Sequence, residues 1–145
     1  ARERLAEASV PDENVTVVHV PGAFEIAITG QRFGESGDYD AIICLGCLIK
    51  GETMHFEYIA VAASHGIMQA AVTTGVPMAF GVLTTLTEEQ AVARSRSGPD
   101  NKGREAAAAA LEHHEESHRL HRRADDEARA DEPTVRLTPA AARAR

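Results

Sequence analysis

The sequence has few aromatic residues and no long apolar run. Aromatic side chains make up 4% of the 145 residues and tryptophan is missing, whereas alanine supplies much of the 43% apolar share. Small apolar residues suit close packing of helices on a sheet. No run of about 18 apolar residues occurs, so no membrane-spanning helix is expected. Residues 1–14 lack the apolar core of a secretory signal. These absences favour one cytoplasmic α/β domain.

Positive charge is also scarce, because the chain has 15 Lys and Arg residues against 22 Asp and Glu, a net charge of −7. A general nucleic-acid-binding protein presents a basic surface, and this composition does not require one. The balance favours a protein that selects a small ligand through local groups, without nucleic acid or membrane as partner.

The only cysteines, Cys44 and Cys47, have C-x-x-C spacing inside an apolar, strand-like stretch. Residues three apart in a strand point to opposite faces, so these thiols cannot share a metal or form a disulfide. No second cysteine pair is present to complete a zinc site. We expect both side chains to be small buried hydrophobic groups in a reducing compartment.

Apolar periodicity alternates between helix-like and strand-like segments up to about residue 112. Helices are expected over 1–8, 23–33, 53–73 and 88–95 and from 101 onward, and strands over 15–20, 41–49 and 78–83. The stretch 41–49 is almost continuously apolar, which is typical of parallel strands buried on both faces. Thr87 is a plausible N-cap for the fourth helix. This order predicts an open parallel sheet covered by helices on both faces.

The composition changes at His113, where charged residues become dominant. We therefore assign residues 1–112 to the domain and residues 113–145 to a charged helical extension that continues into a disordered tail. His114 and His118 are one helical turn apart and could chelate a divalent ion, although a solvated charged face is the more common arrangement.

The loop after the strand 41–49 is the strongest candidate site, since ligands of open α/β sheets bind at the carboxyl ends of the strands. Gly51 allows a ligand to approach the backbone, and Thr53 offers a hydroxyl and an N–H group at a helix start, where phosphate or carboxylate binds well. A helix capped by its own Thr53 is an equal alternative. His55 could transfer protons, although a lone histidine is more often structural.

Three further positions carry weaker signals. Phe24 could stack on a flat ring, but core packing is the commoner role of such a residue. Glu25 has the position of an acidic residue at a helix N-terminus. Lys102 and Glu105 are three residues apart on one helix, and a surface ion pair without a further role is one reading of this spacing.

Four segments in this order and spacing resemble the lumazine synthase family: VPGAFEIA, GCLIKGETMHFEYIA, GVPMAFGVLTTLTEEQAVAR and NKGREAAAAALE. The resemblance covers residues 1–112. It implies a flavodoxin-like three-layer α/β/α sandwich with a four-stranded parallel sheet, whose first strand has no counterpart in this sequence. The family's usual Ala-Gly after the third segment is replaced by Ser95 and Arg96.

The resemblance also implies an activity in riboflavin biosynthesis. Members of this family condense 5-amino-6-(D-ribitylamino)uracil with 3,4-dihydroxy-2-butanone 4-phosphate, giving 6,7-dimethyl-8-ribityllumazine, phosphate and water without a cofactor or metal. They form pentamers, some of which pack into icosahedral shells, with active sites between subunits, and riboflavin synthase is a candidate partner. The alternative is a catalytically degenerate shell or ligand-binding protein of the same fold.

Carried onto this sequence, the resemblance assigns proton transfer to His55 and phosphate binding to Glu52, Thr53 and Arg94. Phe80 would pack on the pyrimidine of a neighbouring subunit's site. The complete set of implied substrate-binding residues is Ala23, Phe24, Glu25, Cys47, Leu48, Ile49, Lys50, Phe80, Lys102 and Glu105.

Overall fold

A computed structural model describes residues 1–130, of which residues 1–115 belong to one compact unit. The elements in chain order are α1 (Arg2–Glu7), the 3-10 turns η1 (Asp12–Asn14) and η2 (Ala23–Glu25), α2 (Ile26–Ser36), β1 (Ile42–Ile49), α3 (His55–Thr74), β2 (Met78–Thr85), α4 (Glu88–Ser95) and α5 (Lys102–Ala130). The predicted disordered tail falls mainly on residues 131–145, outside the described residues, and the boundary after residue 112 stays a prediction.

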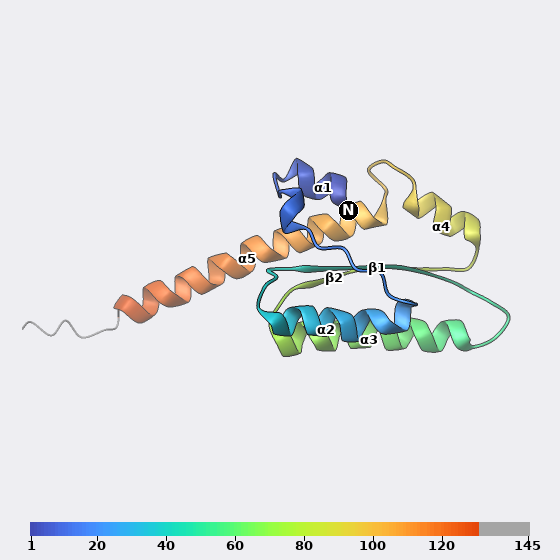
Figure 1. The fold of residues 1–145 in the computed structure, drawn as a ribbon, viewed down its shortest axis with the longest axis horizontal. Coiled ribbons are helices and arrows are strands. Elements are labelled where there is room, and N and C mark those ends of the chain that lie inside the picture. The colour runs from blue at the N-terminus through green and yellow to red at the C-terminus, as the bar shows by residue number, and fades with distance from the viewer. Residues whose placement is uncertain (131–145) are drawn as a thin grey trace, which may run out of the picture. The chain divides into compact units, whose positions relative to one another are not determined.

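A parallel pair of strands forms the centre of the compact unit. β1 and β2 are hydrogen-bonded in register from Ile42 opposite Met78 to Ile49 opposite Thr85. Helices α2 and α3 cover one face, while α1, α4 and the first turns of α5 lie on the other (Figure 1). The predicted α/β class with a parallel sheet is confirmed.

The predicted strand over residues 15–20 is wrong. This segment has no strand assignment, and the sheet of residues 1–130 has two strands, β1 and β2. Val17 and Val18 are 56% and 51% exposed. β-branched residues favour an extended backbone, but a strand also needs a partner for its N–H and C=O groups. In the described part of the chain this segment pairs with neither β1 nor β2, so it forms no strand.

The core lies mainly between the sheet and the α2–α3 layer. Ile26, Cys44, Ile67 and Val82 form a buried cluster between these elements. On the other face, α5 packs closely because its contact residues are small. A Cβ atom added at Gly81 would lie 2.9 Å from the Cβ of Ala106, whose side chain is buried. The alanine-rich composition therefore serves close helix–sheet packing, as expected.

Helices α2 and α3 pack against each other in the same layer, and a glycine permits their closest approach. A Cβ atom added at Gly66 would lie 2.7 Å from the Cβ of Ala27, well inside van der Waals contact. Glycine weakens the interior of a helix, so its presence here is explained by the space that Ala27 occupies.

We predict that Gly66→Ala destabilises the fold. An extra methyl group in a packed contact costs about 1–3 kcal/mol, whereas replacing glycine by alanine in a helix gains about 1 kcal/mol, so the net loss should reach up to about 2 kcal/mol. Thermal and urea unfolding measure it. The double variant Ala27→Gly/Gly66→Ala should show favourable coupling, because it moves the methyl group to the other helix. Additive effects of the two substitutions would contradict the proposed contact.

Candidate active site

The loop from Lys50 to Met54 connects the end of β1 to the start of α3, as the sequence predicts. The Lys50 N–H group donates to the Thr85 carbonyl over 2.9 Å, which continues the β1–β2 ladder one residue beyond the strand. Gly51, Glu52, Thr53 and Met54 are exposed, and no atom lies within 4 Å of a Cβ added at Gly51. The loop thus leaves open space at the carboxyl edge of the sheet, where a ligand could approach its backbone.

Thr53 lies immediately before α3 and interacts with its first residue. The His55 N–H group donates to Thr53 Oγ1 at 3.4 Å, a long hydrogen bond, and the N-cap residue Met54 provides no side-chain cap. The first N–H groups of a helix have no intrahelical acceptors. The start of α3 is therefore only weakly capped by its own side chains, which leaves donors suitable for an anion.

Lys50 forms an ion pair that sequence reasoning missed. Its Nζ atom lies 2.8 Å from Glu57 Oε1, and both side chains are partly exposed. The hydrogen bond from Lys50 lowers the pKa of the Glu57 carboxyl, with a smaller contribution from the backbone N–H group of Glu57. Glu57 follows two residues after His55 within the second motif, so its position in that motif was the available signal. The pair fixes the Lys50 side chain over the first turn of α3.

The first group of predicted site residues lies around this loop. Turn η2 contacts both β1 and α3, so it belongs to the same corner of the fold. Phe24 in this turn is 58% exposed, so core packing is wrong for its side chain. The predicted residues in this corner are Ala23, Phe24 and Glu25 in η2, Cys47, Leu48 and Ile49 at the end of β1, Lys50, Glu52 and Thr53 in the loop, and His55 at the start of α3.

The two cysteines differ in exposure, which corrects one expectation. Cys44 is buried, as expected, and burial raises the pKa of its thiol to about 11. Cys47 is exposed, so its expected burial is wrong. The strand places the two thiols on opposite faces, and only the face of β1 that carries Cys44 is packed on the α2–α3 layer.

A second group of predicted site residues surrounds a separate cavity of about 300 Å³, named the second cavity after this group. Phe80 from β2, Arg94 from α4, and Lys102 and Glu105 from the first turn of α5 line it, together with backbone and small side chains of β2 and α5. No residue of the loop Lys50–Met54 lines this cavity. One described chain therefore assembles the predicted residues in two places.

The second cavity has two cationic groups with different partners. Lys102 Nζ pairs with Glu105 Oε2 at 2.5 Å, as the spacing of these residues predicts. Arg94 Nη1 donates to the Gln90 carbonyl at 3.0 Å, within its own helix. Thr87 accepts a hydrogen bond from the Gln90 N–H group at 3.3 Å, which confirms it as the N-cap of α4. Helix α4 therefore has a defined start and presents Arg94 from its last turn.

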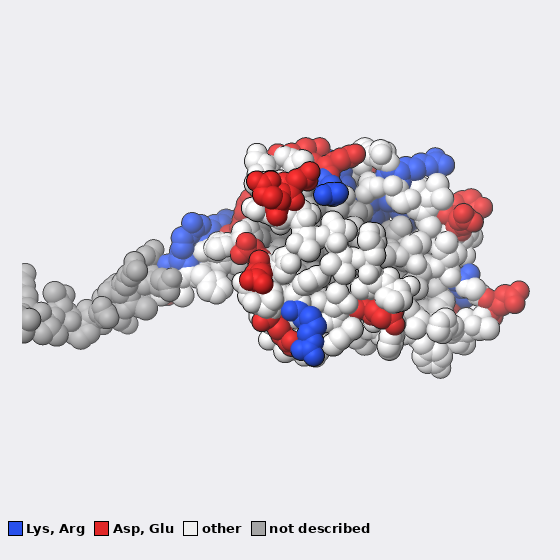
Figure 2. All heavy atoms as spheres, viewed as in Figure 1, with Lys and Arg blue, Asp and Glu red and all other residues white. Residues whose placement is uncertain are grey.

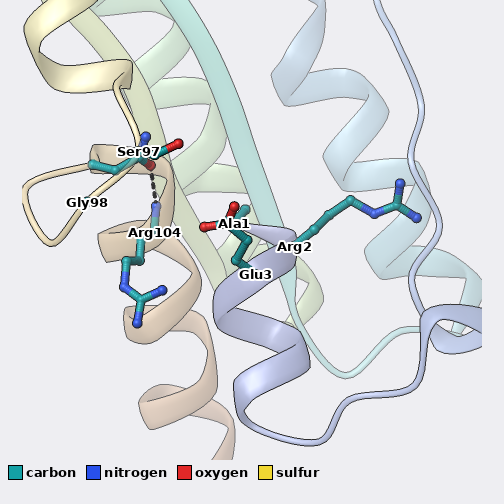
Figure 3. Close-up of a pocket in the computed structure, with 7 residues that line it drawn as sticks. Ala1, Arg2, Glu3, Ser97, Gly98 and Arg104 are labelled. Carbon is teal, nitrogen blue, oxygen red and sulfur yellow. Dashed lines mark hydrogen bonds between the residues drawn. The ribbon is translucent and has the colours of Figure 1, made fainter.

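A further cavity of about 240 Å³ lies beside α1 and contains none of the predicted residues. Asn101 is one of its lining residues. Ala1, Arg2 and Glu3 line it on one side, and Ser97, Gly98 and Arg104 on the other (Figure 3). Arg104 donates hydrogen bonds from both terminal nitrogens to the carboxylate of Glu7, and these bonds join α5 to α1. This ion pair lowers the pKa of Glu7 and raises that of Arg104. The ion pair holds α1 against α5 and engages the guanidinium of Arg104 with Glu7.

The molecular surface agrees with the acidic composition. Figure 2 shows acidic and basic side chains placed around a largely uncharged centre on the face in view, without a broad basic patch. None of the helices formed by residues 1–130 is both long enough and apolar enough to cross a membrane.

Comparison with known proteins gives a consistent family. A sequence model of 6,7-dimethyl-8-ribityllumazine synthase matches residues 1–117. The chain is 50% identical over 111 residues to 6,7-dimethyl-8-ribityllumazine synthase 1 of Caulobacter vibrioides, covering 77% of this chain and 72% of that relative. It is 54% identical over 100 residues to 6,7-dimethyl-8-ribityllumazine synthase of Salinibacter ruber, covering 69% of this chain and 64% of that relative. The family inferred from the four motifs is confirmed.

We predict that a thiol reagent modifies one cysteine per native chain and two per unfolded chain. Cys47 is exposed, whereas burial and a raised pKa protect Cys44 at pH 8. Mass spectrometry after brief alkylation measures the difference. Cys47→Ser should abolish native-state labelling, and labelling of Cys44 in that folded variant would contradict the assignment.

Proposed function

Because the chain belongs to the 6,7-dimethyl-8-ribityllumazine synthase family, we propose that it is a transferase of riboflavin biosynthesis. It condenses 5-amino-6-(D-ribitylamino)uracil with 3,4-dihydroxy-2-butanone 4-phosphate and releases 6,7-dimethyl-8-ribityllumazine, phosphate and water. The family match over residues 1–117 carries the proposal. The placement of the matched motifs at the carboxyl edge of the sheet and around the second cavity supports it.

The phosphorylated substrate binds at the start of α3. Glu52 and Thr53 contribute backbone N–H groups and the Thr53 hydroxyl, while the helix dipole favours the negative charge. The weak cap at 3.4 Å supports this assignment, because a ligand oxygen could replace the Thr53 acceptor at small cost. Holding the phosphate there also stabilises it as a leaving anion.

His55 transfers protons beside the loop Lys50–Met54. Condensation of an amine with a ketone requires a proton to leave nitrogen and water to leave carbon, and both steps need a group that can accept and donate a proton. His55 is the first residue of α3 and is exposed, next to the proposed phosphate site. The pyrimidine lies against the end of β1 and Phe24, whose exposed ring is available for stacking.

The second cavity supplies the remainder of a neighbouring subunit's site. Phe80, Arg94, Lys102 and Glu105 line a cavity that excludes the loop Lys50–Met54. In the parallel register Phe80 lies opposite Cys44, whereas Lys50 follows Ile49 opposite Thr85, a separation of roughly 20 Å along the strands. An active site between subunits accounts for both groups, with Arg94 reaching the phosphate bound to the adjacent chain.

A stripe of exposed side chains that begins at Met54 and continues along α3 supports homo-oligomerisation. Its members are Met54, Tyr58, Val61, Met68 and Val72, which are 55–72% exposed. With His65, they are spaced alternately by four and three residues, the pattern of a seam between packed helices. The opposite side of α3 is already buried, through Ala63, Ile67 and Ala70. An apolar stripe of this kind on a water-exposed helix favours contact with a second copy.

The family implies that this association is a pentamer, and we propose that state. Closure into an icosahedral shell, a riboflavin synthase partner and a cytoplasmic location are further predictions from the same family. No cofactor or metal is needed for the proposed reaction.

We predict different kinetic defects from the proposed site residues. His55→Ala should lower kcat by about tenfold to a hundredfold, because proton transfer is slowed. Arg94→Ala and Thr53→Val should chiefly raise KM for the phosphorylated substrate, by roughly tenfold for Arg94, which loses a charge-assisted bond. Arg32→Ala is the control, since Arg32 pairs with Glu35 on the surface of α2. Product absorbance measures the rates, and unchanged kinetics in all three variants would contradict the assignments.

Mixed assemblies test whether the site combines two chains. His55→Ala and Arg94→Ala should each be impaired alone, but co-assembly should restore part of the activity through sites that take both intact residues from different subunits. Assemblies mixed after separate folding should stay impaired, which is the control. Failure of co-assembled variants to recover would place the complete site in one chain. Inactivity of a well-folded wild-type chain would favour the degenerate shell or ligand-binding protein.

We predict that Met68→Asp disrupts the oligomer, because association would bury the new carboxylates in an apolar seam. Gln69→Asp is the matched control, since Gln69 is exposed on the same helix but lies outside the stripe. Sedimentation velocity should show smaller species for Met68→Asp alone. Equal assembly of the two variants would exclude α3 as the contact surface.

A further inference from the structure

We propose that Asn101 is a positioning residue that sets the separation of Arg94 and Lys102. Its side-chain Nδ2 donates to the Ser95 carbonyl at 2.7 Å and to the Arg96 carbonyl at 2.9 Å. Its Oδ1 accepts from the Arg104 N–H group at 2.8 Å. One half-buried amide group thus joins the end of α4 to the beginning of α5.

These three bonds satisfy groups that the two helices cannot satisfy themselves. The last carbonyls of a helix and its first N–H groups have no intrahelical partners. Asn101 caps α5 through its oxygen and the end of α4 through its nitrogen, using both amide hydrogens. Serine or aspartate would cap α5 comparably but could not donate two hydrogen bonds. The double contact therefore gives a specific reason for asparagine at this position.

The bonds from Asn101 to the Ser95 and Arg96 carbonyls, here called the tie, lie directly beside the two cationic residues of the second cavity. Ser95 follows Arg94, and Asn101 precedes Lys102, while Arg94 and Lys102 both line the cavity of about 300 Å³. The intervening loop turns at Gly98, whose φ of +136° is unfavourable for other residues. Figure 3 shows Ser97 and Gly98 of this loop beside Arg104. Without these bonds, the positions of the two cations depend on a loop whose one internal backbone hydrogen bond runs from the Asn101 N–H group to the Gly98 carbonyl.

The use of backbone acceptors also explains why the sequence tolerates Ser95 and Arg96. Both residues contribute carbonyl oxygens to Asn101, and a carbonyl is present whatever the side chain. Replacement of the family's usual Ala-Gly pair therefore leaves the connection between α4 and α5 intact. The geometry depends on Asn101 instead.

Asn101→Ser tests the role, and the kinetic part rests on the proposed function. Serine keeps a cap for α5 but removes both bonds to α4. We expect KM for 3,4-dihydroxy-2-butanone 4-phosphate to rise about tenfold, with kcat and KM for the amine within about twofold of wild type. Hydrogen exchange of residues 92–96 should accelerate about tenfold, while exchange of α5 residues 104–110 should stay unchanged.

Thr87→Ala is the matched control, because it removes the cap at the other end of α4. It should lower stability without raising KM for the phosphorylated substrate. An equal rise in both variants would overturn the proposal in favour of general loosening of α4, and so would an unchanged KM in Asn101→Ser. If Asn101→Ser does not fold, Asn101→Asp replaces it with the same expected rise in KM.

The exchange measurement separates the two proposals. If the wild-type chain has no synthase activity, the proposed function fails, whereas faster exchange at residues 92–96 in Asn101→Ser would still support the tie. Unchanged exchange at these residues would overturn the tie whatever the activity.

Discussion

The parallel pairing of β1 with β2 determines where helices α3 and α4 begin. The register places Ile49 opposite Thr85, so both strands end at one edge of the sheet. The bond from Lys50 N–H to the Thr85 carbonyl extends that edge by one residue. Helices α3 and α4 both start just beyond it, after short loops. The exposed donors at the start of α3 and the cap at Thr87 are consequences of this shared edge.

Sequence periodicity predicted the elements whose formation depends on nearby residues. The helix now seen as α3 was recognised from its apolar spacing, and α4 from the position of Thr87 before acidic residues. The segment 15–20 failed because a strand requires a partner, which valine content cannot specify. The expected burial of Cys47 was wrong for a related reason. Continuous apolar character suggested that both faces of the strand are covered, whereas one face of β1 carries exposed side chains.

The motifs named the candidate-site residues one by one, but the sequence did not predict how the fold groups them. The motifs named Lys50, Arg94 and Lys102, yet spacing along the chain gives no measure of which of them meet in space. Glu57 was missed because its bond with Lys50 requires the loop to turn back over α3. The fourth motif shows the same limit. Lys102 and Glu105 were recognised for their charges, whereas the neighbouring Asn101 makes bonds that exist only after α4 has folded.

Helix α3 has apolar residues on two sides, one packed inside the unit and one exposed to water. Folding of a single chain removes only the first side from solvent, while the proposed association would remove the second. A partner that binds only the folded state raises the stability of that state by mass action, and the partner proposed for α3 is another copy of the same chain. The resistance of this protein to heat should therefore depend on its own concentration, and dilution alone should bring it closer to unfolding.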